Sequence, residues 1–359
     1  MYRIFFENPI LNSSFCINTL FFKQTVVVLV IKIYTLGGIY MVNTVFLNLA
    51  KLNFDNKLDF SSITKLSTFT KYDENINEKI LERVKGQTII ITKELPLSGK
   101  LISEFPSSVK LICEAGTGYN NIDIDAARKK GITVCNVPSY STQAVANLVI
   151  TYILNFSSSL IQQQIMLKEK NFDNFNKHLQ LPHFELQNKT LGVIGGYGAI
   201  GREVIKVALA IGMNIIIYSR SEKSWENPNV HFASLEELLK QSDFVSINCP
   251  LTKDTLHLIN KDRLKLMKPS AFIINTSRGA IIKETDLIKS LQNGDIAGAA
   301  LDVQDPEPPE INNPLFDMEN VILTPHIGWR RFESRQRLIE LMAGNIESFI
   351  KGKPINVVN

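Results

Sequence analysis

Lys189-Thr-Leu-Gly-Val-Ile-Gly-Gly-Tyr-Gly-Ala-Ile-Gly201 is the stretch that most constrains the fold of this chain. An apolar strand pattern runs directly into Gly196-Tyr-Gly198-Ala-Ile-Gly201, and a helical pattern continues to Ile211. In this GxGxxG context we expect Gly196 to permit a tight turn, Gly198 to let a pyrophosphate approach, and Gly201 to let the helix pack on the strand. Gly195 could also be the first glycine of the triplet. We therefore predict a dinucleotide site formed by Gly196, Tyr197, Gly198, Ala199, Ile200 and Gly201.

The end of the next predicted strand, Tyr218-Ser-Arg-Ser221, bears on which dinucleotide binds. An NAD-selective site usually carries Asp or Glu about 20 residues after the glycine loop, where it grips the ribose hydroxyls. Ser219 and Arg220 stand there instead, and together they can hydrogen-bond a 2′-phosphate and offset its charge. The sequence therefore favours NADP(H) over NAD. The alternative is that Arg220 is a solvated surface arginine and either cofactor is used.

Short apolar runs alternate with helix-like stretches on both sides of this loop. A first strand is expected at 41–49, and helices are expected at 123–130, closed by Gly131, and at 284–293, closed by Gly294. Buried strands are expected at 87–92, 110–114, 132–136, 190–194, 214–218, 244–248, 271–275, 298–302 and 321–324. This alternation predicts an α/β protein with parallel sheets covered on both faces. The polar stretch 168–188 is the clearest irregular connection between the two series.

Residues 1–40 differ from the rest of the chain in composition. They are rich in Phe, Ile and Asn, and their one apolar run, 25–31, is far shorter than the ~20 residues that span a bilayer. Their match to a secretory signal is weak. We interpret residues 1–40 as a non-native or disordered extension, with translation starting at Met41.

The overall composition excludes several classes of partner. The 359 residues are 45% hydrophobic and 21% charged with a net charge of +4, which is ordinary for a two-domain globular enzyme. No basic tract predicts nucleic-acid binding, and no segment predicts a membrane partner. The histidines and the cysteines have no metal-ligand spacing, so no metal is expected. The separated cysteines are typical of a reducing compartment, and we expect a cytoplasmic protein. They are Cys16, Cys113, Cys135 and Cys249.

Three late strands are each followed by one reactive side chain. Arg278 follows the run 271–275, Glu307 lies in a proline-containing loop after 298–302, and His326 follows 321–324. The carboxyl ends of the strands border the ligand crevice in an open α/β sheet, so the three side chains are expected to converge there. Singly, each has a structural explanation, such as an ion pair or a hydrogen-bonded loop histidine. Together, beside a dinucleotide loop, they favour a catalytic interpretation.

These residue types suit the reduction of a 2-keto acid. A guanidinium matches the planar carboxylate of such a substrate, which assigns that task to Arg278. His326 would supply the proton for the carbonyl oxygen, because imidazole titrates near neutral pH. Glu307 would favour the imidazolium and fix the ring orientation. We predict that the chain interconverts a small 2-hydroxy acid and its 2-keto acid with a nicotinamide dinucleotide.

At this point the chain resembles the D-isomer-specific 2-hydroxyacid dehydrogenases, from about Met41 to the C-terminus. The motifs that carry the resemblance are Ala115-Gly-Thr-Gly-Tyr-Asn-Asn-Ile-Asp123, Asn136-Val-Pro-Ser-Tyr-Ser-Thr142, the glycine loop, Asn275-Thr-Ser-Arg-Gly279, the segment 302–308 and Thr324-Pro-His-Ile-Gly328. The resemblance implies that Arg278, Glu307 and His326 form the catalytic set. It places Asp302 near the nicotinamide, and Pro250 and Thr276 in the cofactor site. It assigns the substrate to Arg278, His326 and the backbone N–H groups of Gly116, Thr117 and Gly118.

The family architecture implies two doubly wound parallel-sheet domains. Residues 41–141 and 329–359 would form a flavodoxin-like substrate domain. A Rossmann cofactor domain, residues 142–328, would be inserted between them, with the active site in the cleft. Members are usually dimers joined through the cofactor domain, so a homodimer is expected.

Within the family, Gly118-Tyr-Asn120 and His326-Ile-Gly-Trp329 followed by Ser334-Arg-Gln-Arg-Leu resemble the glycerate dehydrogenase and hydroxypyruvate (glyoxylate) reductase branch. Ser219 departs from the usual acidic residue, and Asn147 stands where many relatives carry Glu. The end at Asn359 argues against the longer phosphoglycerate dehydrogenases. The alternatives are a dehydrogenase for another acid such as D-lactate, and a dinucleotide-sensing co-repressor. Formate-dehydrogenase-like chemistry is disfavoured because Glu307 replaces that relative's glutamine.

Overall fold

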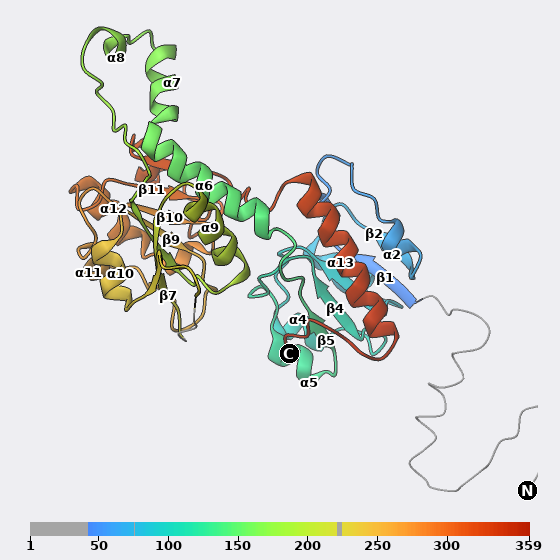
Figure 1. Ribbon diagram of the computed structural model, residues 1–359. Helices are drawn as coiled ribbons and strands as arrows, with labels where there is room; N and C mark the ends of the chain where they lie inside the picture. The colour runs from blue at the N-terminus through green and yellow to red at the C-terminus, as the bar shows by residue number, and fades with distance from the viewer. Residues whose placement is uncertain (1–41, 75, 221–224) are drawn as a thin grey trace, which may run out of the picture. The chain divides into compact units, whose positions relative to one another are not determined.

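The computed structural model describes residues 42–74, 76–220 and 225–359, shown in colour in Figure 1. The interpretation of residues 1–40, the predicted start at Met41 and the position of Ser221 lie outside the described residues. Two parallel sheets organise the described chain, and their strands come from separate stretches of sequence.

The first sheet has five strands in the order β2-β1-β3-β4-β5. Its strands are β1 Val42–Phe46, β2 Ser67–Lys71, β3 Ile89–Thr92, β4 Leu111–Glu114 and β5 Thr133–Cys135. The pairs β1–β3, β3–β4 and β4–β5 are parallel, and every residue of β3 and β4 is buried. This order is the doubly wound order of flavodoxin-like sheets, as predicted.

The second sheet has seven strands in the order β12-β11-β10-β9-β6-β7-β8. Its strands are β6 Thr190–Ile194, β7 Asn214–Tyr218, β8 Val230–Phe232, β9 Phe244–Ile247, β10 Phe272–Asn275, β11 Gly298–Leu301 and β12 Val321–Leu323. All six strand pairs are parallel. The strand order reverses between β6 and β9, which is where Rossmann sheets bind their ligands. The predicted fold class is therefore confirmed.

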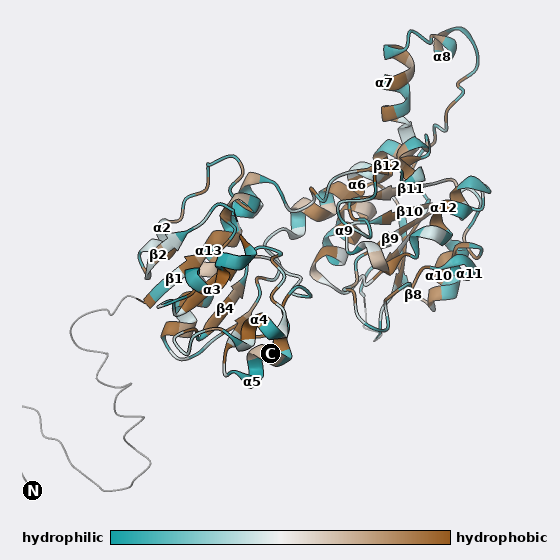
Figure 2. Ribbon diagram, turned by 180° about the vertical axis from the view of Figure 1, so that it is seen from behind, coloured by the Kyte–Doolittle hydropathy of each residue, from teal (hydrophilic) through white to brown (hydrophobic). Residues whose placement is uncertain are grey.

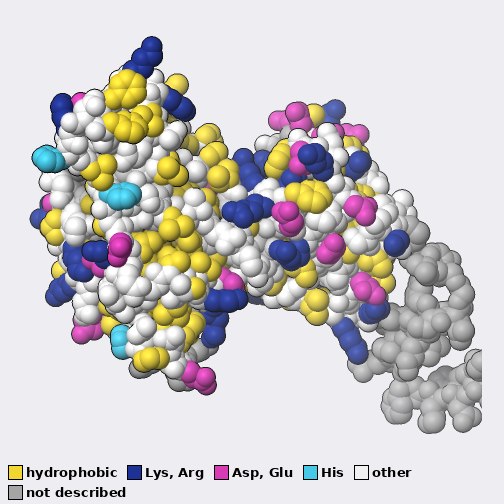
Figure 3. Space-filling model, turned by 45° about the horizontal axis from the view of Figure 1, so that its top comes forward, with side chains coloured by type: hydrophobic (Ala, Val, Ile, Leu, Met, Phe, Trp, Pro, Cys, Tyr) yellow, Lys and Arg dark blue, Asp and Glu magenta, His cyan; other side chains and the backbone are white. Residues whose placement is uncertain are grey.

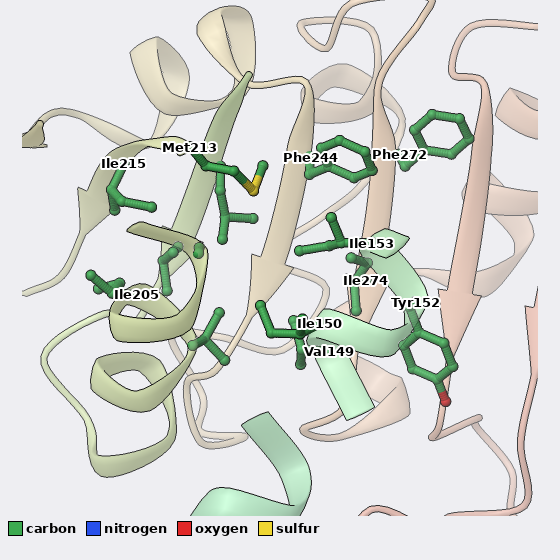
Figure 4. Packing of buried hydrophobic residues seen from close by; sticks show 14 of the residues in the cluster. Val149, Ile150, Tyr152, Ile153, Ile205, Met213, Ile215, Phe244, Phe272 and Ile274 are labelled. Atoms are coloured by element: carbon green, nitrogen blue, oxygen red, sulfur yellow. The ribbon is translucent and has the colours of Figure 1, made fainter. Parts of the chain in front are cut away.

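Helices cover both faces of the second sheet. The long α6, Thr142–Ser158, packs against α9, Ala199–Ala210, and against β10. Figure 4 shows α6 side chains such as Ile153 directed toward Phe244 and Phe272 of the strands, whose rings stack with centroids 5.4 Å apart. The other face carries the helices α10 Leu235–Gln241, α11 Lys261–Leu264 and α12 Glu284–Gln292. Burial of these two apolar faces is the main stabilising contribution to this sheet.

Shorter helices surround the first sheet. They are η2 Leu49–Lys51, α2 Ser61–Thr64, η3 Asn77–Lys79, α3 Ile80–Arg83, α4 Gly99–Ser103 and α5 Ile124–Lys129. Helix α5 begins at an Asp123 N-cap whose carboxylate accepts from the Ala126 N–H, and Gly131 follows it at φ +71°. This is the predicted helix with its predicted glycine end. The short η4 Gly279–Ile281 and η5 Pro314–Asp317 lie in the connections of the second sheet.

The C-terminal helix α13, Phe332–Ile350, returns to the first sheet. Buried Arg335 forms an ion pair of 2.6 Å with Asp55, and the Asn345 side chain donates to the Asn136 carbonyl. The Val358 N–H donates to the Val134 carbonyl. These contacts support the expected return of residues 329–359 to the first sheet, while the exact domain boundaries stay a prediction.

A helical arm extends from the second sheet at α7, Leu160–Lys168, and α8, Asp173–Asn176 (Figure 1). Ser159 separates α6 from α7 with φ +47°, and the two helices are bent by 59° there. Among the described residues, no unbroken helix has the length and apolar character to cross a bilayer, and α6 with α7 reaches them only as this bent pair. In the hydropathy colouring of Figure 2 the ribbon of this arm carries both hydrophobic and hydrophilic residues.

Candidate active site

A cavity of about 750 Å³ is bordered by the carboxyl ends of strands from both sheets. The first sheet contributes the loops after β3, β4 and β5, the last of which leads into the start of α6. The second contributes the loops after β6, β7, β9, β10, β11 and β12. The lining comprises Lys93, Glu94, residues 116–120, 138–142, Val145, residues 198–200, Arg220, residues 248–252, residues 276–278, Asp302, His326, Gly328 and Trp329.

The glycine loop needs each of its glycines for a different reason. Gly195 has φ +84°, and a Cβ there would lie 2.7 Å from the Asn248 carbonyl oxygen. A Cβ on Gly196 would lie 2.9 Å from the Ile217 side chain. A Cβ on Gly201 would lie 2.7 Å from the Gly195 oxygen, so only glycine lets α9 pack against the loop. The tight turn expected at Gly196 is therefore at Gly195, which explains the additional glycine.

The start of α9 fits a dinucleotide phosphate. Gly198 is its N-cap, no side chain caps it, and the N-terminal N–H groups of a helix carry a partial positive charge. A Cβ on Gly198 would have only backbone oxygens within 4 Å, the nearest at 3.3 Å. Beside it, within the described chain, the buried Thr276 Oγ1 and Asn248 Oδ1 have no hydrogen-bond partner. Buried polar atoms are normally paired, so these two fit a ligand that would hydrogen-bond them.

The predicted cofactor residues separate into three groups. Tyr197 packs against Trp225, with ring centroids 6.0 Å apart, and Ser219 follows β7 without joining the cavity wall that the described residues form. Gly196 lies against the Ile217 side chain, and Gly201 lies against the backbone of Gly195 and Gly196. Those that line the cavity are Gly198, Ala199, Ile200, Arg220, Pro250, Thr276 and Asp302.

Arg278 and the predicted substrate loop come together although they belong to different sheets. A Cβ on Gly118 would fall 1.8 Å from Arg278 Nη2, so the guanidinium lies against the bare Gly118 backbone. The Arg278 Nη1 donates to the Ser277 carbonyl at 2.7 Å. The Gly116 carbonyl accepts from the Val137 N–H, and the Thr117 carbonyl accepts from the Asn136 side chain.

Beside the Arg278 guanidinium lie the backbone N–H groups of Gly116, Thr117 and Gly118. No group in the described part of the chain accepts a hydrogen bond from them. Three unpaired amides beside a guanidinium can hold a carboxylate through charge-assisted hydrogen bonds. The arrangement fits the substrate loop predicted from the sequence.

His326 and Glu307 form the predicted pair. The His326 Nδ1 lies 2.9 Å from Glu307 Oε2, and the other carboxylate oxygen of Glu307 accepts from the Gln304 N–H. Burial acts to raise the pKa of Glu307, but the hydrogen bond and charge of His326 lower it below its usual range. The carboxylate is therefore ionised at neutral pH and holds Nδ1 as the protonated nitrogen. The His326 Nε2 is left for the cavity.

The loop that carries His326 is anchored by the Asp302 carboxylate. Asp302 is buried, and it accepts hydrogen bonds from the Thr324 hydroxyl and from the N–H groups of Ile327 and Gly328. His326 itself has φ +50°, and its N–H donates to the Asp302 carbonyl. A side chain in this left-handed conformation persists only where neighbouring bonds hold it. Asp302 therefore positions His326 in addition to lining the cavity.

Several cavity residues were missed by the sequence analysis. Asn248 and Cys249 follow the carboxyl end of β9, which is the same signal that identified Arg278, so they could have been found. Burial raises the pKa of the Cys249 thiol to about 11, and it is a neutral thiol at physiological pH. Lys93 belongs to no local motif, and Trp329 belongs to the motif 326–329 without any signal that it lines the cavity. The place of both residues in the cavity depends on contacts between distant segments.

Comparisons with known proteins agree with this geometry. Residues 150–328 match the family model described as D-isomer specific 2-hydroxyacid dehydrogenase, NAD binding domain. The chain is 35% identical to a hydroxypyruvate reductase of Blautia hydrogenotrophica, over 84% of this chain and 95% of the relative. It is 40% identical to a glyoxylate reductase of Thermococcus litoralis, over 78% and 86%. A D-lactate dehydrogenase structure from Aquifex aeolicus, solved with NAD and lactic acid, is 30% identical with a TM-score of 0.76, over 87% and 96%. The chain therefore belongs to the D-isomer specific 2-hydroxyacid dehydrogenase family, and its seven-stranded sheet is the nicotinamide-dinucleotide-binding part.

Proposed function

We propose that this dehydrogenase interconverts small D-2-hydroxy acids and their 2-keto acids, with hydroxypyruvate and glyoxylate as its preferred keto acids. The observation that carries the proposal is one cavity lined by Arg278, by the residues 116–118 with their unpaired amides, by His326 and by the open start of α9. Glu307 holds the His326 ring from outside the cavity wall. The printed activities of the bacterial and archaeal relatives support the choice of keto acids.

The chain's own residues have distinct tasks in this reaction. A bound nicotinamide dinucleotide supplies or accepts the hydride. Arg278 and the amides of Thr117 and Gly118 hold the substrate carboxylate and thereby orient the keto group. The His326 imidazolium hydrogen-bonds the keto oxygen through Nε2 and donates its proton as that oxygen gains charge. Glu307 holds the ring and stabilises its positive charge.

The same cavity supports a preference for NADP(H). Arg220 follows β7, is exposed and lines the cavity, and no carboxylate stands at Ser219. An arginine there can pair with a 2′-phosphate, whereas an acidic residue would repel it. A KM for NADPH at least several-fold below that for NADH would support this preference, and the reverse ratio would overturn it.

The contacts of α13 with the first sheet support a division into two domains. We propose that 142–328 form the cofactor domain and that 41–141 with 329–359 form the substrate domain. The His326 loop ends at this second boundary, where the chain continues into α13. Free thiols at Cys113, Cys135 and Cys249 support a reducing, cytoplasmic location.

The helical arm supports a homodimer. No residue of α7 is buried, and a short helix of this kind is marginal in water without packing. Figure 3 shows hydrophobic side chains gathered on this part of the surface. The exposed apolar residues of the arm are Leu160, Ile161, Ile165, Leu167, Phe172, Phe175 and Leu179. A dimer in sedimentation that Ile165→Glu converts to a monomer would support this proposal, whereas a monomeric wild type would contradict it.

The test of the proposed activity is a panel of keto acids reduced with NADPH and with NADH. We expect turnover of hydroxypyruvate and glyoxylate at rates above those for pyruvate and for bulkier keto acids. A strong preference for pyruvate would support the D-lactate alternative, for which the Aquifex aeolicus structure is the supporting observation. Inactivity on every keto acid, with dinucleotide binding intact, would instead support a dinucleotide-sensing binding protein.

A further inference from the structure

Lys93 is a buried cation in the cavity that the catalytic steps do not use. It follows β3, and its side chain is 2% exposed. Its Nζ donates to Glu94 Oε1 at 2.6 Å and lies 4.1 Å from the centroid of the Trp329 ring. A Cβ on Gly116 would lie 3.4 Å from this Nζ. The ammonium therefore stands at the Gly116 end of the substrate loop, while Arg278 stands at the Gly118 end.

The surroundings of Lys93 hold it as a charged donor. Burial alone acts to lower its pKa, but Tyr140, Glu94 and Glu114 raise the pKa above its usual range. Burying an ammonium is costly unless it is paired. Among the described residues its one hydrogen bond goes to Glu94, the Trp329 ring covers one side, and Tyr140 and Glu114 interact with its charge. One hydrogen bond leaves donor capacity of the ammonium unused.

Two neighbours provide independent signs of an unfilled polar subsite. The Trp329 Nε1 is buried without a hydrogen-bond partner in the described residues, and Trp329 lines the cavity. Glu94 also lines the cavity, with its side chain 40% exposed and its backbone at φ +54°. Strained backbone of this kind is retained where a side chain must be aimed. Donors and an acceptor thus meet beside the substrate loop.

We propose that Lys93 and Glu94 form a subsite for a hydroxyl group on C3 of the 2-keto acid, and so select 3-hydroxylated substrates. The inference rests on the proposed function and deepens it. With the carboxylate held on the amides of 116–118 and on Arg278, the Lys93–Glu94 pair beside Gly116 is left for C3. The charges of Arg278 and His326 also act on Glu94, so the pair borders the reacting groups. The Lys93 ammonium donates to the hydroxyl oxygen, and the Glu94 carboxylate accepts the hydroxyl proton.

The charge of the pair discriminates against other C3 groups. Because Glu94 already neutralises Lys93, a second substrate carboxylate gains little attraction and is repelled by Glu94. A methyl group at C3 of the keto acid would lie against the Lys93 and Glu94 side chains but could not hydrogen-bond to either of them. A site built to hydrogen-bond a hydroxyl rejects an analogue without it more strongly than an apolar pocket rejects an added methylene. Glyoxylate has no C3 and leaves the subsite to water.

The test compares hydroxypyruvate, pyruvate and glyoxylate in the wild type and in Lys93→Met. Methionine keeps the length and apolar contacts of the lysine stem but removes the donor. We expect kcat/KM for hydroxypyruvate to fall about 10- to 100-fold, the range for a lost hydrogen bond to a charged group. The fall for pyruvate and glyoxylate should be at least about tenfold smaller, because neither places a hydroxyl there. Lys100→Met, on the exposed surface of α4, is the matched control.

A binding readout accompanies the kinetics. D-glycerate should raise the Tm of the dinucleotide-bound wild type more than D-lactate does, and Lys93→Met should abolish that difference. If Lys93→Met does not fold, Glu94→Gln should reduce the hydroxypyruvate-to-pyruvate ratio of kcat/KM in the same direction. Equal losses on all three keto acids would overturn the subsite while leaving the proposed function intact. A wild type inactive on all three would overturn the proposed function, and this inference with it.

Discussion

Two glycine-containing loops face the same cavity, and they prepare it for anions in different ways. The loop 195–201 follows β6 and leads at once into the twelve residues of α9, so backbone amides and the helix dipole supply the positive potential. The loop 116–118 follows β4 but leads to a turn before the short α5. Its amides are unpaired as well, yet its positive charge comes from the Arg278 side chain of the other sheet.

The difference explains why one loop could be identified locally and the other could not. The groups of the proposed phosphate loop all lie within the few consecutive residues 195–201. The proposed substrate loop depends on the Arg278 guanidinium, about 160 residues further along the chain. A substrate carboxylate that must be oriented for reaction needs the directional hydrogen bonds of a guanidinium. A bound pyrophosphate needs only to be held in place.

The largest effect is expected from a substitution that removes the proposed proton donor and leaves both loops unchanged. His326→Gln should lower kcat for keto-acid reduction by about 10²- to 10⁴-fold, because it removes the proton donor. Dinucleotide affinity, measured by fluorescence titration, should stay within about threefold of wild type, since no phosphate contact changes. A variant with nearly normal kcat would rule out His326 as the donor.

Gly118→Ala should damage the substrate loop alone. The new Cβ would displace the flexible end of Arg278 from the backbone, 1.8 Å away in the present geometry. We expect kcat/KM for the keto acid to fall about a hundredfold, as for other small misplacements of a positioning group. The Tm should hardly change, because a long side chain can move aside. Loss of dinucleotide binding in this variant would show that the two loops are not independent.

Gly201→Ala is the same substitution in the other loop, with the opposite pattern. Its Cβ would meet backbone atoms, Gly195 O at 2.7 Å and Gly196 Cα at 2.8 Å, which cannot move aside cheaply. Overpacking of this kind costs about 1–3 kcal/mol, so dinucleotide affinity should fall roughly tenfold or more and the Tm should drop. The keto-acid KM at saturating dinucleotide should change little. Unchanged dinucleotide affinity would remove the packing role assigned to Gly201.

The smallest expected effect is a shift in pH dependence. The lowered pKa of Glu307 means that its carboxylate stabilises the His326 imidazolium at neutral pH. In the proposed reaction a protonated Glu307 no longer supports that imidazolium, so kcat/KM should decline as pH falls through the lowered pKa of Glu307. In Glu307→Gln, which has no titratable group at this position, this acidic decline should disappear. Glu307→Asp should restore it, and an unchanged decline in the Gln variant would contradict the pairing.

Most of the fold could be predicted from the sequence because its strands are buried and continuous. β6 and β7 were predicted with their observed bounds, and the first strand was predicted to end three residues beyond the end of β1. The other predicted strands agree to within two residues at each end. Two edge strands, β2 and β8, were missed: Ser67-Thr-Phe-Thr-Lys71 is polar and half exposed, and Val230–Phe232 has only three residues. Short or solvated edges lack the apolar run that marks a central strand.

The convergence of Arg278, Glu307 and His326 was predictable because each member follows a strand, and parallel strands end at one edge. The turn at Gly195, the hydrogen bonds that Asp302 accepts from the His326 loop and the Lys93–Glu94 pair were not. Each depends on backbone conformation or on contacts between segments far apart in sequence, which no local spacing encodes. Contacts of this kind can be read only from the folded chain.

The most direct test is a crystal structure of the enzyme with NADP(H) and oxamate, an unreactive mimic of a 2-keto acid. We predict that the pyrophosphate lies at the start of α9. The oxamate carboxylate should lie on the amides of 116–118 and on Arg278, and the oxamate carbonyl oxygen should lie within hydrogen-bond distance of His326 Nε2. Oxamate bound away from Arg278, or a carbonyl oxygen turned away from His326, would contradict this prediction.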